Sequence, residues 1–276
     1  MTIDLWQAVV MGVVQGFTEF LPISSSGHLI LVPALLGWQD SPVDQLEFTV
    51  ALHGGTLIAL LAVFWRDWVE LIGAALRSLG RRSLKVPNSR LAWLLVLGTL
   101  PGAIAGALFE KKIEDALRAP LVVGITMAGV ALVLAAADIW SRKNQDEHSL
   151  GATGAFGIGC AQALALVPGV SRSGITISAG LGLGLTRSAA ARFSFLLSAP
   201  IVAGALVKEG YDVVRAGLPP GEAVGFAVGV LAAAISGFIA IRWLLRYLAR
   251  GSLMPFVAYR LIVGGIVIVL ALAGRI

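Results

Sequence analysis

Charged residues are scarce in this chain: Asp, Glu, Lys and Arg make up 13% of its 276 residues, against about 25% in a typical soluble domain. Apolar residues make up 57% of the chain, and its mean hydropathy is +0.87. So few charges cannot cover the outside of a water-soluble globule. Most of the surface must therefore face lipid, which excludes a soluble enzyme.

Cysteine is almost absent too, because Cys160 is the only one. This excludes an intramolecular disulfide and a thiolate metal cluster. The first six residues contain Asp4 but neither Lys nor Arg, so the positive start of a cleavable signal peptide is missing. We expect the first apolar stretch to belong to the mature protein. The net charge of +5 comes from residues between hydrophobic stretches, where Lys and Arg set orientation in a membrane, so no nucleic-acid partner is expected.

Long apolar stretches dominate the chain. A spanning helix needs about 20 mostly apolar residues, and six stretches qualify, at 47–65, 91–109, 121–140, 193–207, 223–245 and 255–273. Two further stretches, 3–37 and 152–185, are interrupted by Pro, Ser and Gly at 22–27 and 168–174. Broken helices at membrane depth are tolerated only where protein covers the backbone or a cavity adjoins it. Both therefore predict re-entrant helix-turn-helix hairpins.

The two halves of the chain resemble each other when the first is shifted by about 147 positions. The shift brings together four pairs of identical residues at the breaks: Gln15 with Gln162, Ser24 with Ser171, Ser26 with Ser173 and Gly27 with Gly174. Each half, 1–140 and 151–276, contains one hairpin and three spans. Because three is an odd number of membrane crossings, the second half enters the membrane in the opposite orientation to the first. The sequence thus predicts an all-α polytopic membrane protein, one integral membrane domain with an inverted repeat. The basic segments 66–90 and 242–250 are expected on the cytoplasmic side.

Ionisable residues within apolar helices are costly unless paired or wet, so each is a functional candidate. The first hairpin holds Glu19 and His28, with the polar Gln15 near them, and the second holds Arg172. Gln15 and Glu19 are four residues apart and share one helical face. A lone Glu in such a helix is often only a structural hydrogen-bond partner. Here the Glu stands near serines and a histidine, and the other half of the chain adds an arginine. This combination predicts a functional site.

Serines cluster where each interrupted helix should restart, namely Ser24, Ser25, Ser26, Ser171 and Ser173. Their simplest role is N-capping, because hydroxyls satisfy the free N–H groups of a first turn. Helix N-termini also bind anions, and a guanidinium holds phosphate oxygens in a bidentate manner. Together with the arginine of the second break, two such N-termini predict a phosphate-binding pocket.

His28 follows Ser25 by three residues, within reach on one helical face. Such a pair can act as nucleophile and general base, and we expect this pairing, with a metal-bound water as the alternative attacker. His53 is expected at a helix start and His148 in a charged loop, so neither is given a role.

At these residues a resemblance appears. Residues 15–28 (QGFTEFLPISSSGH) and 168–176 (PGVSRSGIT) resemble the two signature motifs of the undecaprenyl-diphosphate phosphatase family, also known as bacitracin-resistance proteins, and length and hydropathy agree over the whole chain. The resemblance implies hydrolysis of undecaprenyl diphosphate to the monophosphate in the bacterial inner membrane, recycling the lipid carrier of peptidoglycan synthesis. It also implies a divalent cation, Mg or Ca.

Residue by residue, the resemblance implies four catalytic positions, Glu19, Ser25, His28 and Arg172. Glu19 is also the predicted metal ligand. Many family members have Glu where this chain has Gln15, so a site with two carboxylates is not expected here. The predicted substrate-binding residues are Gln15, Ser24, Ser26, Gly27, Ser171, Ser173, Gly174 and Thr176.

Two other functions share features with this sequence. Acid-phosphatase-like lipid phosphatases also use Ser-Gly-His and Ser-Arg signatures, but Ser178 and Gly182 occupy the positions where their His and Asp would stand. Inverted repeats with broken helices are typical of secondary transporters, so a polyprenyl-phosphate flippase is the second hypothesis. The expected partners are the lipid substrate and membrane lipids, and the sequence leaves a monomer and a homodimer both open.

Overall fold

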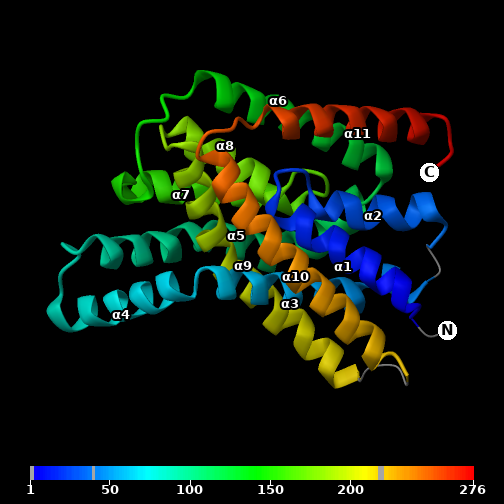
Figure 1. The fold of residues 1–276 in the computed structure, drawn as a ribbon, viewed down its shortest axis with the longest axis horizontal. Coiled ribbons are helices and arrows are strands. Elements are labelled where there is room, and N and C mark those ends of the chain that lie inside the picture. The colour runs from blue at the N-terminus through cyan, green and yellow to red at the C-terminus, as the bar shows by residue number, and fades with distance from the viewer. Residues whose placement is uncertain (1–2, 39–40, 217–220) are drawn as a thin grey trace.

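The computed structural model describes residues 3–38, 41–216 and 221–276, and within them it is all helical (Figure 1). No strand occurs in those ranges, only an isolated bridge between Gln145 and Leu185. The α-helices are α1 (Leu5–Phe20), α2 (Ser25–Leu36), α3 (Leu46–Val63), α4 (Trp65–Arg81), α5 (Pro87–Leu117), α6 (Pro120–Trp140), α7 (Ala152–Ala163), α8 (Arg172–Gly182), α9 (Arg187–Ala216), α10 (Ala223–Leu248) and α11 (Met254–Leu272). Short 3-10 helices are η1 (Pro42–Asp44), η2 (Glu147–Ser149) and η3 (Leu164–Leu166).

Six helices of the described ranges are long and apolar enough to cross a bilayer, as the sequence predicts. They are α3, α6, α10 and α11 in full, together with Pro87–Phe109 of α5 and Arg187–Lys208 of α9. Their mean hydropathy is between 1.7 and 2.4. The chain is therefore a multi-pass membrane protein.

The basic segment after the first span, 66–90, contains a helix and is not only a loop. Helix α4 follows α3 almost directly and lies alongside α5 (Figure 1). Its apolar residues recur every three or four positions, which is the spacing of an amphipathic helix. Val69 and Leu76 are each 64% exposed, so this stripe faces away from the protein.

The helices that precede the two breaks pack in a reciprocal way. Helix α1 of the first half lies against α10 of the second, and α7 of the second lies against α5 of the first. Both contacts are made backbone to backbone: a Cβ at Gly12 would come within 2.4 Å of the Gly229 carbonyl oxygen, and one at Gly159 within 2.3 Å of the Gly98 carbonyl oxygen. Gly12 and Gly159 are 147 residues apart. Small residues permit this approach of two backbones. A span of each half therefore packs against the helix that precedes the break of the other half.

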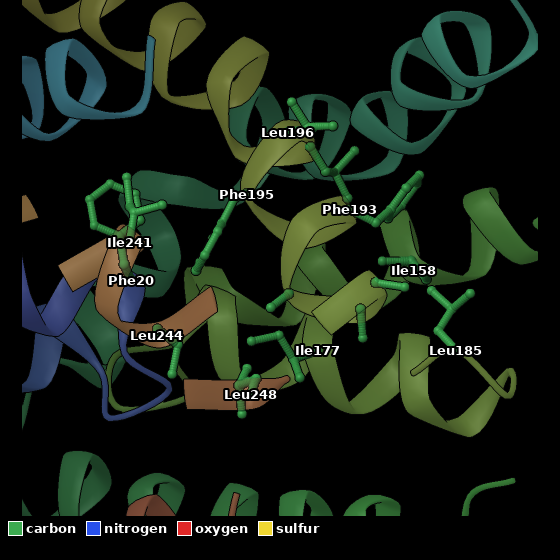
Figure 2. Close-up of a cluster of buried hydrophobic side chains, with 14 of the residues drawn as sticks. Phe20, Ile158, Ile177, Leu185, Phe193, Phe195, Leu196, Ile241, Leu244 and Leu248 are labelled. Atoms are coloured by element: carbon green, nitrogen blue, oxygen red, sulfur yellow. The ribbon is translucent and has the colours of Figure 1, made fainter. Parts of the chain in front are cut away.

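Buried apolar side chains of α1, α7, α8, α9 and α10 gather into one cluster (Figure 2). Phe20, the last residue of α1, makes an edge-to-face contact with Phe195 of α9, with 5.6 Å between ring centroids. Ile177 of α8 and Leu244 of α10 are fully buried in the same cluster. Dense packing of this kind leaves few alternative positions for a side chain. The core thus fixes the end of α1, where Glu19 stands.

Candidate active site

The two helix breaks have the same backbone conformation. Ser24 caps α2 with φ 81° and ψ 97°, and Ser171 caps α8 with φ 71° and ψ 112°. Each hydroxyl accepts a hydrogen bond from the backbone N–H three residues later, at 3.3 Å from Gly27 and 3.1 Å from Gly174. Positive φ is strained for a residue with a side chain. The hydrogen bond that the serine hydroxyl accepts from the backbone N–H offsets this strain.

The breaks meet in space, although about 147 residues separate them. Arg172 Nη2 donates to Glu19 Oε1 at 2.8 Å. Ser173 Oγ donates to the Leu21 carbonyl oxygen at 3.0 Å, and the Gly169 N–H donates to Ser26 Oγ at 3.4 Å. The predicted approach of the two breaks is confirmed. A ligand at this point can touch both halves of the chain.

Glu19 is the centre of the polar contacts. It is 7% exposed, and its two oxygens have different partners. Oε1 accepts from Arg172, while Oε2 accepts from Ser25 Oγ at 2.6 Å and from Gln15 Nε2 at 3.2 Å. The shared face predicted for Gln15 and Glu19 is confirmed. The short bond to a carboxylate oxygen means that the Ser25 hydroxyl proton already points at an acceptor.

His28 is not that acceptor, which corrects the expected Ser25–His28 pair. Its Nδ1 lies 2.6 Å from the Ser24 carbonyl oxygen, and its Nε2 lies 2.7 Å from the Tyr259 hydroxyl. A carbonyl oxygen only accepts, so Nδ1 donates to Ser24, and in a neutral ring Nε2 then accepts from the Tyr259 hydroxyl. The three-residue spacing brought serine and histidine onto one turn, but both ring nitrogens are directed to other partners.

His53, which the sequence gave no role, lies at the site instead. Its Nε2 is 3.8 Å from Glu19 Oε2, and its side chain is 33% exposed. Nδ1 lies 2.9 Å from the Thr49 carbonyl oxygen, so it donates there and Nε2 faces the carboxylate. His53 stands inside α3, in the first predicted span. That position was itself a signal, because an ionisable residue inside a span is a functional candidate.

Arg260 is a second residue of the site to which the sequence alone gives no role, although it stands inside the last span. It is fully buried. Its guanidinium donates to the carbonyl oxygens of both breaks, at 3.3 Å to Pro22, 2.9 Å to Gly169 and 3.1 Å to Val170. It also donates to the Met127 carbonyl oxygen of α6 at 3.0 Å. One cation thus ties the two non-helical segments together.

The remaining predicted residues fall into two groups. Ser26 and Ser171 line the cavity described below, together with Glu19, Ser25 and Arg172. The other predicted substrate-binding residues hold the breaks in place and do not line that cavity: Gln15, Ser24, Gly27, Ser173, Gly174 and Thr176. Thr176 Oγ1, for example, is 2.6 Å from Ser194 Oγ. A Cβ at Gly27 would come within 3.2 Å of Val123, so this glycine fits a tight contact.

A cavity of about 560 Å³ opens in front of Glu19, Ser25 and Arg172. Its wall also includes apolar and small side chains of α2, α5 and α9, among them Ile30, Ala103, Ala107, Ile201 and Ala205, and the basic side chains of Arg118 and Lys208. A polar end and an apolar wall suit an anionic headgroup that is joined to a hydrocarbon chain. Arg172, with its side chain 12% exposed, places a largely desolvated guanidinium at the polar end.

A divalent cation would find carboxylate and amide oxygens here, with the His53 imidazole nearby. The described residues contain no group of three or more His, Cys, Asp or Glu that is placed to hold a metal ion. Glu19 offers a carboxylate, and Gln15 Oε1 is buried without a hydrogen-bond partner. Mg²⁺ commonly binds through one or two carboxylates together with substrate phosphates, so Glu19 fits a cation that the substrate completes. Gln15 Oε1 is a further oxygen ligand that lies outside the cavity lining.

Comparison with known proteins shows the family of this chain. Residues 8–266 match the family described as bacitracin resistance protein BacA. An undecaprenyl-diphosphatase of Pelobacter propionicus is 46% identical over 272 residues, which is 98% of each chain. An undecaprenyl-diphosphatase of Rubrobacter xylanophilus is 48% identical over 271 residues, covering 98% of this chain and 99% of the relative. The similarity thus includes both breaks and all six spans.

Proposed function

Because the chain belongs to the bacitracin resistance protein family and hydrolyses undecaprenyl diphosphate, we propose that Ser25 is the nucleophile of this hydrolysis and Glu19 its proton acceptor. The observation that supports this most strongly is the 2.6 Å hydrogen bond from Ser25 Oγ to Glu19 Oε2. A nucleophile and a base at this distance need no rearrangement before proton transfer.

The reaction would proceed in two displacements. Ser25 Oγ forms a bond to the terminal phosphorus, its proton passes to Glu19, and the bond to the bridging oxygen breaks. The electron pair stays on the departing undecaprenyl phosphate. Water then attacks the phosphorus of the phosphoserine, and the bond from phosphorus to Ser25 Oγ breaks. Phosphate leaves with the oxygen and one hydrogen of the water, and the other proton returns to Ser25 Oγ by way of Glu19. Both steps pass through a charged phosphoryl group, which positioned cations and N–H groups stabilise.

Arg172 supplies that stabilisation from the second break. Nη2 is bonded to Glu19, and Nη1 reaches the Ser194 carbonyl oxygen only at 3.4 Å. A phosphate oxygen is a stronger partner for Nη1 than this distant carbonyl. The guanidinium would then join the carboxylate to the transferring group. The N-termini of α2 and α8 add backbone N–H groups that favour an anion.

His53 would move the proton onward. Its Nε2 faces Glu19 Oε2 at 3.8 Å while Nδ1 is committed to Thr49. A carboxylate that has received the Ser25 proton can pass it to this imidazole when the substrate draws the two closer. His28 would be a positioning residue, because it links the first turn of α2 to Tyr259 of α11.

Glu19 and Gln15 Oε1 would hold a divalent cation, Mg or Ca. When bound, the cation supplies positive charge to the oxygens of the diphosphate. Gln15 Nε2 keeps Glu19 Oε2 oriented in either case.

The proposed setting is the bacterial inner membrane, with the two broken helices as re-entrant hairpins of an inverted repeat. The reciprocal packing of α1 with α10 and of α7 with α5 supports the repeat. Two halves, 1–140 and 151–276, would then form one membrane domain. Transport of polyprenyl phosphate has no support of comparable weight, because the relatives are called diphosphatases.

Phosphate release by purified variants in detergent tests the proton acceptor. Glu19→Gln is expected to lose ~10²–10⁴ in kcat, the usual contribution of a positioned base. His28→Ala should lose only about tenfold, because it removes hydrogen bonds that position α2. Tyr259→Phe is the matched control, since it breaks the same bond and leaves the imidazole. A His28→Ala loss equal to that of Glu19→Gln, with Tyr259→Phe near normal, would restore His28 as the base.

A further inference from the structure

Gln162 presents an unpaired amide beside the reaction site. It is 4% exposed, and neither Nε2 nor Oε1 has a hydrogen-bond partner. It also lines the cavity that contains Glu19, Ser25 and Arg172. Buried amides are nearly always hydrogen-bonded, and one left unpaired destabilises the folded state. A side chain that is unsatisfied at the edge of a cavity points to a ligand.

Comparison with Gln15 shows what the amide lacks. Gln15 stands at the equivalent position of the first break, 147 residues earlier, and its Nε2 donates to Glu19 Oε2. The residue that corresponds to Glu19 in the second break is Leu166. The second amide has thus lost its anionic partner, and Leu166 lines the same cavity. An anion in the cavity would take the place of that carboxylate.

We infer that Gln162 binds the lipid-linked phosphate of the substrate, with Nε2 donating to a non-bridging oxygen. The assignment rests on the proposed attack at the terminal phosphorus, which gives Ser25 and Arg172 the outer phosphate. Gln162 packs against α5, where a Cβ at Gly102 would be 3.2 Å from Nε2. Ala103 and Ala107, part of the apolar wall, follow on the same helix. The inner phosphate and the start of the prenyl chain therefore pass Gln162.

The amide has no hydrogen bond to break when it turns toward an anion. The same feature predicts opposite effects on stability and on binding. Gln162→Leu removes an unsatisfied polar group and keeps the volume, so the free protein becomes more stable. A glutamine with a purely structural role would lose stability on the same change.

The test is equilibrium binding of farnesyl phosphate and of inorganic phosphate to the full chain in detergent, together with its melting temperature. Thr99→Val is the matched control, because Thr99 lines the same cavity and its hydroxyl already donates to the Leu95 carbonyl oxygen at 2.7 Å. Gln162→Leu should raise the Kd for farnesyl phosphate by about tenfold or more, as for a hydrogen bond to a charged group. It should leave the Kd for inorganic phosphate unchanged and raise the melting temperature. Thr99→Val should change neither Kd.

Gln162→Glu gives a second measurement if the leucine variant does not fold, because its charge should repel farnesyl phosphate more strongly still. Unchanged affinity for farnesyl phosphate in both variants would overturn the assignment, as would an equal loss for inorganic phosphate. Binding is measured without turnover. A wrong nucleophile would therefore leave these affinities as predicted, and a wrong role for Gln162 would leave the chemistry at Ser25 intact.

Discussion

At the first helix break a carboxylate and a serine, Glu19 and Ser25, occupy positions that Leu166 and Arg172 occupy at the second, 147 residues later. Around them the breaks are alike: both have a serine cap at positive φ and a hydroxyl bonded to a glycine N–H. Shared residues build the backbone, and the residues that differ carry the chemistry. The proposed nucleophile comes from one break and the cation from the other.

The difference between the breaks implies that the second contributes the planar guanidinium of Arg172, which offers several N–H donors as well as a positive charge. Arg172→Lys should therefore lose ~10²–10³ in kcat/KM, nearly as much as Arg172→Ala, because a point charge cannot hold a carboxylate and a phosphate in one plane. Phosphate release by purified variants measures this. Near-normal turnover of the lysine variant would reduce Arg172 to a general positive charge.

The likeness of the two breaks predicts equal effects at the two caps. Ser24→Ala and Ser171→Ala should each lower the free energy of unfolding by about 1 kcal/mol, since alanine loses the cap and keeps the strained φ. Glycine at either position should lower it by only a few tenths of a kcal/mol, roughly, because it tolerates the backbone. Thermal unfolding in detergent compares the four variants. A large loss at one break alone would show that the caps have different roles.

The smallest effect is expected at Gln15, where the two breaks still have the same residue. Gln15→Glu should keep turnover within about threefold and make it depend more steeply on Mg or Ca, because a second carboxylate adds a hard oxygen ligand. A titration of activity against the cation concentration measures both. Activity without any change in cation dependence would place the cation away from Gln15.

Much of this architecture could be predicted from the sequence. The six spans follow from the length of their apolar stretches, and the breaks follow from Pro and Ser/Gly clusters. The meeting of Glu19 with Arg172 followed from the likeness of the halves. Helix α4 could not be predicted in this way, because its mixed composition is typical of a charged connection between spans.

The hydrogen-bond pattern of the site could not be predicted. Spacing placed His28 on one turn with Ser25, but it carries no information on Tyr259, which reaches His28 from 231 residues away. His53 and Arg260 come to the site from separate spans in the same way. Such contacts depend on how the spans pack, which local periodicity does not determine.

The central claim is that the first break supplies a nucleophile, and trapping the enzyme during turnover tests it most directly. Protein mixed with farnesyl diphosphate and quenched in acid should carry phosphate on the peptide that contains Ser25, as mass spectrometry would show. Ser25→Ala should lose at least ~10³ in kcat and all of this label, because covalent catalysis fails without its nucleophile. Ser26→Ala, the neighbouring control, should keep both. An unlabelled peptide in the active enzyme, together with substantial turnover by Ser25→Ala, would contradict the claim and make water the attacking group.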